Sequence, residues 1–136
     1  MHDRVSVNAL CFGGPPLAEM EAIWHELAPR RVSFMTSQIL AEGEKAALGV
    51  LARNAYAVET LSHAFLMTPL GSDEASWSEP RSNLSRMIEF ARLAGARSIY
   101  MLTGGRGERT WEEAAEVFCA AVAPCAAQAR AAGVPL

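Results

Sequence analysis

Glu59 and His63 are the residues best suited to acid–base chemistry in this sequence of 136 residues. They lie within and just after a β-rich segment at residues 57–61. An imidazole can relay a proton near neutral pH, and it can also bind a metal ion or a sugar hydroxyl. His63 is therefore a candidate catalytic residue, and a hydrogen-bonded structural histidine is the alternative.

Glu59 lies in the middle of that segment, where an unpaired carboxylate is costly to bury. Two arrangements remove this cost. The carboxylate contacts a substrate, or it forms an ion pair with an arginine such as Arg31 or Arg97. Glu59 is thus the second candidate catalytic residue, and a structural ion pair is the alternative.

A glycine-rich loop, Thr103-Gly104-Gly105-Arg106, follows the last β-rich segment. Backbone amides that converge before a helix start bind phosphate or carboxylate groups readily, and an arginine adds positive charge. The loop has neither the P-loop pattern nor the full glycine pattern of a dinucleotide fold. These four residues are candidate substrate contacts, with a plain tight turn as the alternative.

Three further side chains are candidate substrate contacts. Asn8 shares a predicted strand face with Phe12, and its amide can bond to a sugar or to neighbouring interior groups. Trp77 lies in a predicted loop at residues 64–79. Such a loop is long for a connection and can act as a lid that brings the indole over a substrate.

Alternating β-rich and helical patterns must position these residues. The β-rich segments lie at residues 4–12, 31–35, 57–61 and 98–103. Helical patterns cover about residues 16–28, 44–55, 80–94 and 110–132, and the last opens with a capping box at Thr110 and Glu113. Since parallel neighbours need crossover connections, this alternation predicts an α/β fold with a parallel sheet of four βα units.

The predicted strands have one apolar face and one mixed face. Strict alternation places Asn8, Glu59, Leu61 and His63 on the mixed face, whereas a doubly wound sheet should have nearly continuous apolar strands. The pattern favours a barrel over a small open flavodoxin-like doubly wound sheet, which is the alternative. An eight-unit barrel needs about 250 residues. Residues 1–136 are therefore expected to form a single domain, the N-terminal half of a (β/α)8 TIM barrel, that ends at the start of a fifth strand.

Several segments along the chain carry a resemblance. They are Val5-Ser-Val-Asn with Phe12-Gly-Gly, Met87-Ile-Glu-Phe-Ala-Arg-Leu-Ala-Gly-Ala, Ser98-Ile-Tyr-Met-Leu-Thr-Gly-Gly-Arg-Gly, Thr110-Trp-Glu-Glu-Ala-Ala, and the closing Ala-Gly-Val-Pro-Leu. Together these segments resemble sugar phosphate isomerases/epimerases of the xylose-isomerase-like barrel superfamily. The resemblance implies that the chain is the N-terminal half of a metal-dependent sugar or sugar-phosphate isomerase/epimerase.

The same resemblance implies a divalent metal (Mn, Mg, Zn or Co) in the full-length parent enzyme. In that family the first carboxylate ligand typically follows a segment like Gly133-Val-Pro-Leu, so no metal ligand is assigned within this chain. Relatives that carry His-Pro-Gly after the fourth strand have a ligand there, where this sequence has Thr103-Gly104-Gly105. The isolated chain is accordingly expected to be inactive.

Composition narrows the choice of partners. The net charge of −3 offers no basic surplus for nucleic acid, and no apolar run is long enough for a membrane span. The three cysteines show no disulfide or metal-finger spacing, which favours a cytoplasmic location.

Four strands cannot close a barrel. The inner-face residues Leu10, Phe12, Met35, Leu61 and Leu102 are therefore expected to stay exposed, and a homodimer or higher oligomer is expected to cover them. A non-enzymatic half-barrel scaffold or binding module that self-associates is the alternative to an isomerase half.

Overall fold

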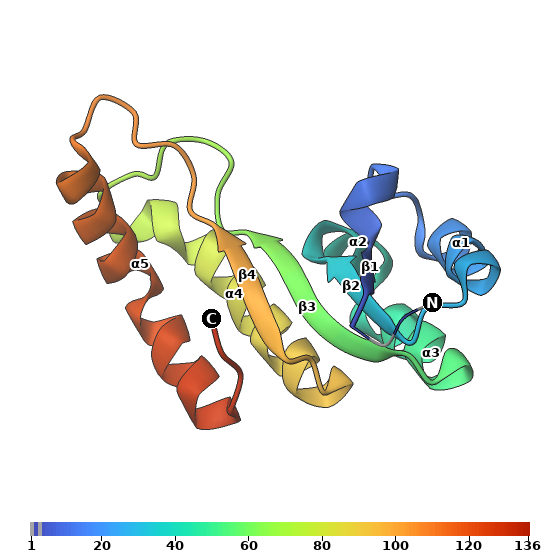
Figure 1. The fold of residues 1–136 in the computed structure, drawn as a ribbon. Coiled ribbons are helices and arrows are strands. Elements are labelled where there is room, and N and C mark those ends of the chain that lie inside the picture. The colour runs from blue at the N-terminus through green and yellow to red at the C-terminus, as the bar shows by residue number, and fades with distance from the viewer. Residues whose placement is uncertain (1, 3) are drawn as a thin grey trace.

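Four parallel strands form one sheet and follow each other in chain order. The computed structural model describes residue 2 and residues 4–136, and its strands are β1 (Ser6–Asn8), β2 (Arg31–Met35), β3 (Ala57–Ala64) and β4 (Ser98–Leu102). The sheet order is β1-β2-β3-β4, with every neighbouring pair parallel (Figure 1). The predicted parallel sheet of βα units is thus confirmed. A flavodoxin-like sheet has the order 2-1-3-4-5, so that alternative is wrong.

Helices fill each connection between strands. They are α1 (Leu17–Leu27), α2 (Thr36–Glu42), α3 (Glu44–Asn54), α4 (Glu74–Ala94) and α5 (Trp111–Ala132), with a 3-10 turn, η1 (Ala9–Phe12), directly after β1. The capping box of α5 is present, because Thr110 Oγ1 accepts from the Glu113 amide and Glu113 Oε2 accepts from the Thr110 amide. Helix α2 is not among the predicted elements, since it begins directly after β2 with no loop or turn signal between them.

Helix α4 begins well before the predicted start at residue 80. Asp73 caps it by accepting from the Ser76 amide at 3.0 Å, and Pro80 lies inside the helix. The proline removes one helical hydrogen bond, but the earlier turn buries Trp77, which is 8% exposed. Trp77 is therefore a core residue of α4 and not part of a lid, and its Nε1 donates to the Gly71 carbonyl at 2.7 Å.

The helices cover one face of the sheet with an aromatic core. Phe34 of β2 lies edge-on to Trp24 of α1 at 5.0 Å between ring centroids, and to Phe90 of α4 at 6.3 Å. All three rings are fully or almost fully buried. Figure 1 shows β3 and β4 in front of α4, so the nearer face of these strands carries no helix.

The opposite face of the sheet is open. Tyr100 is 60% exposed, Leu102 47% and Leu10 58%, whereas Ile99, the strand neighbour of Tyr100, is 1% exposed. Phe12 is also exposed, as predicted for an uncovered inner face. Leu61 is completely buried, so its predicted exposure is wrong.

An irregularity in β3 explains why Leu61 is buried. Val32 pairs with Val58, but the next residue, Ser33, pairs with Thr60, which leaves Glu59 without a partner on β2. Such a bulge inserts one residue and exchanges the faces of every side chain after it. Leu61 and His63 therefore face the helices, and Thr60 occupies the open face.

The last residues of the chain lie beside β4, as Figure 1 also shows. Val134 is buried, and the Pro135 carbonyl accepts a hydrogen bond from the Ile99 amide at 2.9 Å. This bond is the kind that a fifth strand would make on the free edge of β4. No helix in the described residues is long and apolar enough to cross a membrane.

Candidate functional site

Hydroxyl and amide groups line the floor of the open sheet face. Ser6 Oγ and Ser33 Oγ lie 2.9 Å apart across β1 and β2, and Thr60 Oγ1 donates to the Ser98 carbonyl at 3.2 Å across β3 and β4. Small polar side chains of this kind both donate and accept hydrogen bonds. Those that reach the surface can therefore contact a ligand that carries hydroxyl groups, whereas Ser33 is only 2% exposed.

Asn8 lies on this open face, as expected. Its Nδ2 donates to Ser62 Oγ of β3 at 3.3 Å, although β2 separates β1 from β3 in the sheet. A contact that passes over β2 means that the face is concave. Asn8 Oδ1 also accepts from the Leu10 amide at 2.9 Å, so the amide group already has the interior bonds that were the alternative to substrate contact.

A cavity of about 170 Å³ lies beyond the carboxyl end of β4. It is enclosed by the loop after β4, the segment before α4 and the first turns of α5. Its lining residues are Leu70, Thr103, Gly104, Gly105, Arg106, Arg109, Trp111, Ala114, Ala115, Val117, Phe118 and Cys119. The four loop residues singled out in the sequence thus share one cavity, whose remaining lining is largely apolar.

Close backbone contact fixes the loop that encloses this cavity. Gly104 has φ of +91°, and a Cβ atom there would lie 2.7 Å from the Thr68 carbonyl oxygen. Only glycine combines that conformation with that approach. The two loops therefore pack against each other, as the green and orange loops of Figure 1 show.

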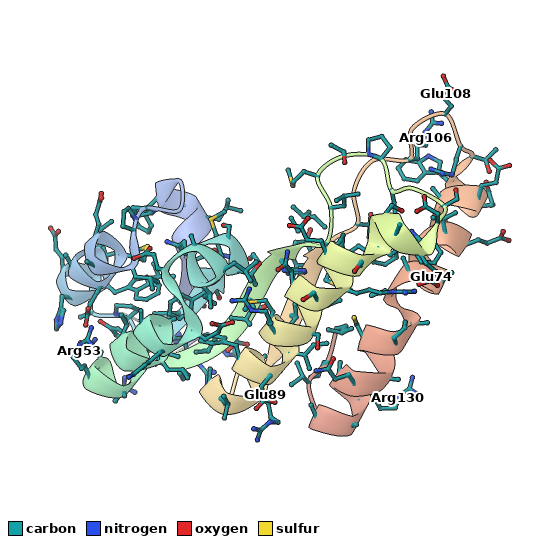
Figure 2. All side chains as sticks on the ribbon, turned by 180° about the vertical axis from the view of Figure 1, so that it is seen from behind. Arg53, Glu74, Glu89, Arg106, Glu108 and Arg130 are labelled. Carbon is teal, nitrogen blue, oxygen red and sulfur yellow. The ribbon has the colours of Figure 1, made fainter. Side chains whose placement is uncertain are left out.

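Two arginines contribute positive charge at the cavity. Arg109 is anchored, since its Nη1 donates to the Leu70 carbonyl at 2.8 Å and its Nη2 to Ser72 Oγ at 2.6 Å. Arg106 Nη1 donates to the Arg109 carbonyl, and its guanidinium lies 5.9 Å from the centroid of the exposed Trp111 ring. Figure 2 shows Arg106 and Glu108 projecting together at the tip of this loop. Arg106 is thus more available than Arg109 to bind an anionic ligand.

His63 does not lie on the open face, and the prediction from strict alternation that it shares a face with Asn8 is wrong. It is 1% exposed, and its Nδ1 lies 2.8 Å from Oγ1 of Thr36, the first residue of α2. Its Nε2 has no hydrogen-bond partner among the described residues. Burial lowers the pKa of His63 from 6.5 to about 4, so the ring is neutral at physiological pH.

Glu59 lies at the opposite end of the sheet from the loop cavity. Its Oε2 accepts from Arg31 at 2.8 Å and its Oε1 from Arg97 at 2.9 Å. The hydrogen bond from Arg97, followed by that from Arg31, lowers the pKa of Glu59. The structural ion pair expected as the alternative is present, and the structure does not bring Glu59 and His63 together.

Several polar residues of this region carry no sequence signal of their own. Ser33, Thr36 and Ser62 follow or lie within strands like any small polar residue. Ser62 reaches the open face only because of the irregularity at Glu59. The contact between Thr36 and His63 depends on the direct junction between β2 and α2. No turn residue marks that junction in the sequence.

The open face does not form a metal site within the described residues. Residue 2 and residues 4–136 contain no group of three or more His, Cys, Asp or Glu side chains that could hold an ion. Hydroxyl and carboxamide groups without a carboxylate make a poor site for a divalent cation. The metal that the resemblance implies is expected in the full-length parent enzyme, and the described residues do not bear on it.

Comparison with known proteins identifies a structural neighbour. No protein-family model matches the sequence, and no curated protein matches it. The fold is similar to the crystal structure of protein SMc04130 from Sinorhizobium meliloti 1021, with a TM-score of 0.75 and 22% sequence identity. The match covers 97% of this chain and 48% of that protein, so this chain spans about half the length of its neighbour.

Proposed function

We propose that this chain is one half of a (β/α)8 barrel of the sugar phosphate isomerase/epimerase type, and that it forms a substrate-binding wall. The observation that carries the proposal is the open sheet face, whose floor is lined by hydroxyl and amide groups. The face adjoins a loop that carries the Arg106 guanidinium. Hydroxyl groups suit a sugar, and the guanidinium suits its phosphate.

The order of the strands supports the part of the proposal that concerns the barrel architecture. Four parallel strands in chain order, with helices on one face, match four consecutive units of a (β/α)8 barrel. The hydrogen bond from the Ile99 amide to the Pro135 carbonyl is of the kind that a fifth strand would make at the edge of β4. The similarity to about half of a longer protein is consistent with this architecture.

The location of the loop cavity supports the part of the proposal that concerns substrate binding. Ligands of such barrels bind at the carboxyl ends of the strands, and Thr103 to Arg106 lie at that end of β4. Arg109 holds the loop in place through the Leu70 carbonyl and Ser72. This arrangement positions and orients a substrate without itself transferring a proton.

Acid–base and metal chemistry are assigned, on this proposal, to residues outside the 136 of this chain. A divalent metal would polarise the carbonyl of a ketose or aldose in the complete barrel. His63 is neutral, buried and turned toward the helices, and Glu59 is engaged by two arginines at the far end. The part played by this chain is binding.

Binding of a sugar phosphate to the isolated chain tests the proposal. We expect fructose 6-phosphate to bind weakly and fructose more weakly still, measured by chemical-shift perturbation in two-dimensional NMR spectra. Arg106→Gln should weaken fructose 6-phosphate binding by about tenfold, because it removes a charge-assisted hydrogen bond to phosphate. No turnover is expected with added manganese.

Arg130→Gln is the matched control, since Arg130 lies in the last turn of α5, and Figure 2 shows it at the other end of that helix from Arg106. This control should bind fructose 6-phosphate like the unmodified chain. Equal binding by the Arg106 and Arg130 variants would contradict the assigned loop. Turnover of a ketose phosphate by the chain alone would contradict its role as a wall, and self-association without any ligand binding would favour the scaffold function.

A further inference from the structure

The loop cavity has an apolar wall to which the proposed function assigns no part of a sugar phosphate. One face of α5 supplies much of this wall, since residues three and four positions apart share a helix face. The residues of that face in the lining are Trp111, Ala114, Ala115, Phe118 and Cys119. Phe118 lies edge-on to the buried Phe65 at 5.6 Å between ring centroids, so packing against the core holds the wall in place.

The volume of the loop cavity suits one aromatic ring. It measures about 170 Å³, and an apolar cavity of about 150 Å³ is large enough to bind benzene. Sugar hydroxyl groups would lose hydrogen bonds to water against such a wall and gain none from it. The rings of Trp111 and Phe118 are both in the lining, and aromatic rings favour edge-to-face or offset contact with a further ring.

The charged residues in the described lining of the cavity are both cationic. They are Arg106 and Arg109, and Glu108, which projects beside Arg106 in Figure 2, is not part of the lining. Arg109 is held by the Leu70 carbonyl and by Ser72. Arg106 donates one hydrogen bond within residues 4–136, to the Arg109 carbonyl, although a guanidinium carries several N–H donors. Arg106 is also exposed, so its other donors can bind an anion.

We infer that the loop cavity binds an aromatic ring that is joined to a phosphate group. The ring occupies the apolar interior, and the phosphate accepts hydrogen bonds from Arg106 at the exposed side. The Arg106 guanidinium lies 5.9 Å from the centroid of the Trp111 ring, so a ring that packs on Trp111 brings its phosphate close to that charge. This inference rests on the proposed function only in taking Arg106 as the phosphate contact, and it adds a class of ligand that lacks a sugar.

Phenyl phosphate is the probe, and inorganic phosphate and benzyl alcohol represent its two parts. We expect phenyl phosphate to bind at least about tenfold more tightly than either part, because it combines burial of the ring with a charge-assisted hydrogen bond. Butyl phosphate, which has no ring, should bind about threefold more weakly than phenyl phosphate. Tryptophan fluorescence measures binding. Trp111 is 73% exposed, whereas Trp24 and Trp77 are buried, so a bound ring should shift the Trp111 emission to shorter wavelength.

Ala114→Leu tests the cavity itself, because its larger side chain fills the space that the ring would occupy. It should weaken phenyl phosphate binding by at least about tenfold, to the level of inorganic phosphate. Ala115→Leu, at an exposed position on the same wall, serves if Ala114→Leu fails to fold by circular dichroism. Ala127→Leu is the matched control, since it makes the same change at an exposed position of α5 outside the described lining. This control should bind phenyl phosphate like the unmodified chain.

Three results would each overturn the inference. Phenyl phosphate binds no more tightly than inorganic phosphate, butyl phosphate binds as tightly as phenyl phosphate, or the folded cavity variant binds phenyl phosphate as tightly as Ala127→Leu does. Fructose 6-phosphate has no aromatic ring, so its binding tests the proposed function alone. Binding of phenyl phosphate without binding of fructose 6-phosphate would support this inference and contradict the proposed function, and the reverse result would contradict this inference only.

Discussion

Replacing Trp24 by alanine is expected to lower the free energy of unfolding by about 3–5 kcal/mol. Trp24 is completely buried and lies edge-on to Phe34 at 5.0 Å and to Tyr56 at 5.5 Å. The substitution leaves a cavity between α1 and β2, and it removes the centre of the aromatic core. Since a domain of this size is stable by about 5–15 kcal/mol, the variant should unfold in much less urea or lose its cooperative transition.

Trp24→Phe is the matched comparison for that experiment. The indole Nε1 is buried with no hydrogen-bond partner among the described residues, and phenylalanine removes this orphan donor while it keeps most of the ring volume. We expect a loss of no more than about 1.5 kcal/mol. Urea unfolding followed by circular dichroism measures both variants. A Trp24→Ala variant as stable as the unmodified chain would contradict the assigned core.

Lowering the pH from 7 to 5 is expected to reduce the free energy of unfolding by about 2 kcal/mol through His63 alone. The pKa of His63 is about 4 in the folded chain, because the ring is buried, and about 6.5 when the chain is unfolded. Between these values the unfolded chain binds more protons, so stability falls as the pH falls. The stabilisation is complete above about pH 6.5 and is lost on approach to about pH 4.

His63→Gln separates this effect from other titrations. Glutamine keeps a polar partner for Thr36 but cannot take up a proton, so the variant should show a nearly constant unfolding free energy between pH 7 and 5. Hydrogen bonds from arginines lower the pKa values of Glu21 and Glu59, which moves their titration below this window. His25→Gln, in an exposed position of α1, is the control that should behave like the unmodified chain. Parallel pH profiles for both variants would rule out the buried imidazole as the cause.

The order of elements could be predicted from the sequence because it depends on local signals. Alternating β-rich and amphipathic segments specify parallel strands with helical crossovers, and Thr110 with Glu113 marks the start of α5 correctly. The predicted helix boundaries were wrong where burial of a side chain in the core outweighed a local sequence signal. Pro80 is typical of a helix start, but burial of Trp77 and the cap at Asp73 extend α4 in front of it.

The candidate site could be predicted only in part. Thr103, Gly104, Gly105 and Arg106 line one cavity because a contiguous loop stays together in any fold. The direction of His63 could not be predicted, since it depends on a register between two strands that the sequence does not display. The ion pairs of Glu59 with Arg31 and Arg97 could be expected from the sequence, because an acidic residue in a strand needs basic partners nearby.

The unpaired residue in β3 also bears on how this sheet tolerates changes in length. A strand with one extra residue exchanges its two faces from that point onward, and deletion of Glu59 would restore regular alternation with Thr60 still opposite Ser33 and His63 still facing the helices. Deletion of Ser62 would instead move His63 into the position that Ser62 now occupies on the concave side. The extra residue at Glu59 therefore allows this strand to lose one residue at that point without exchanging its faces.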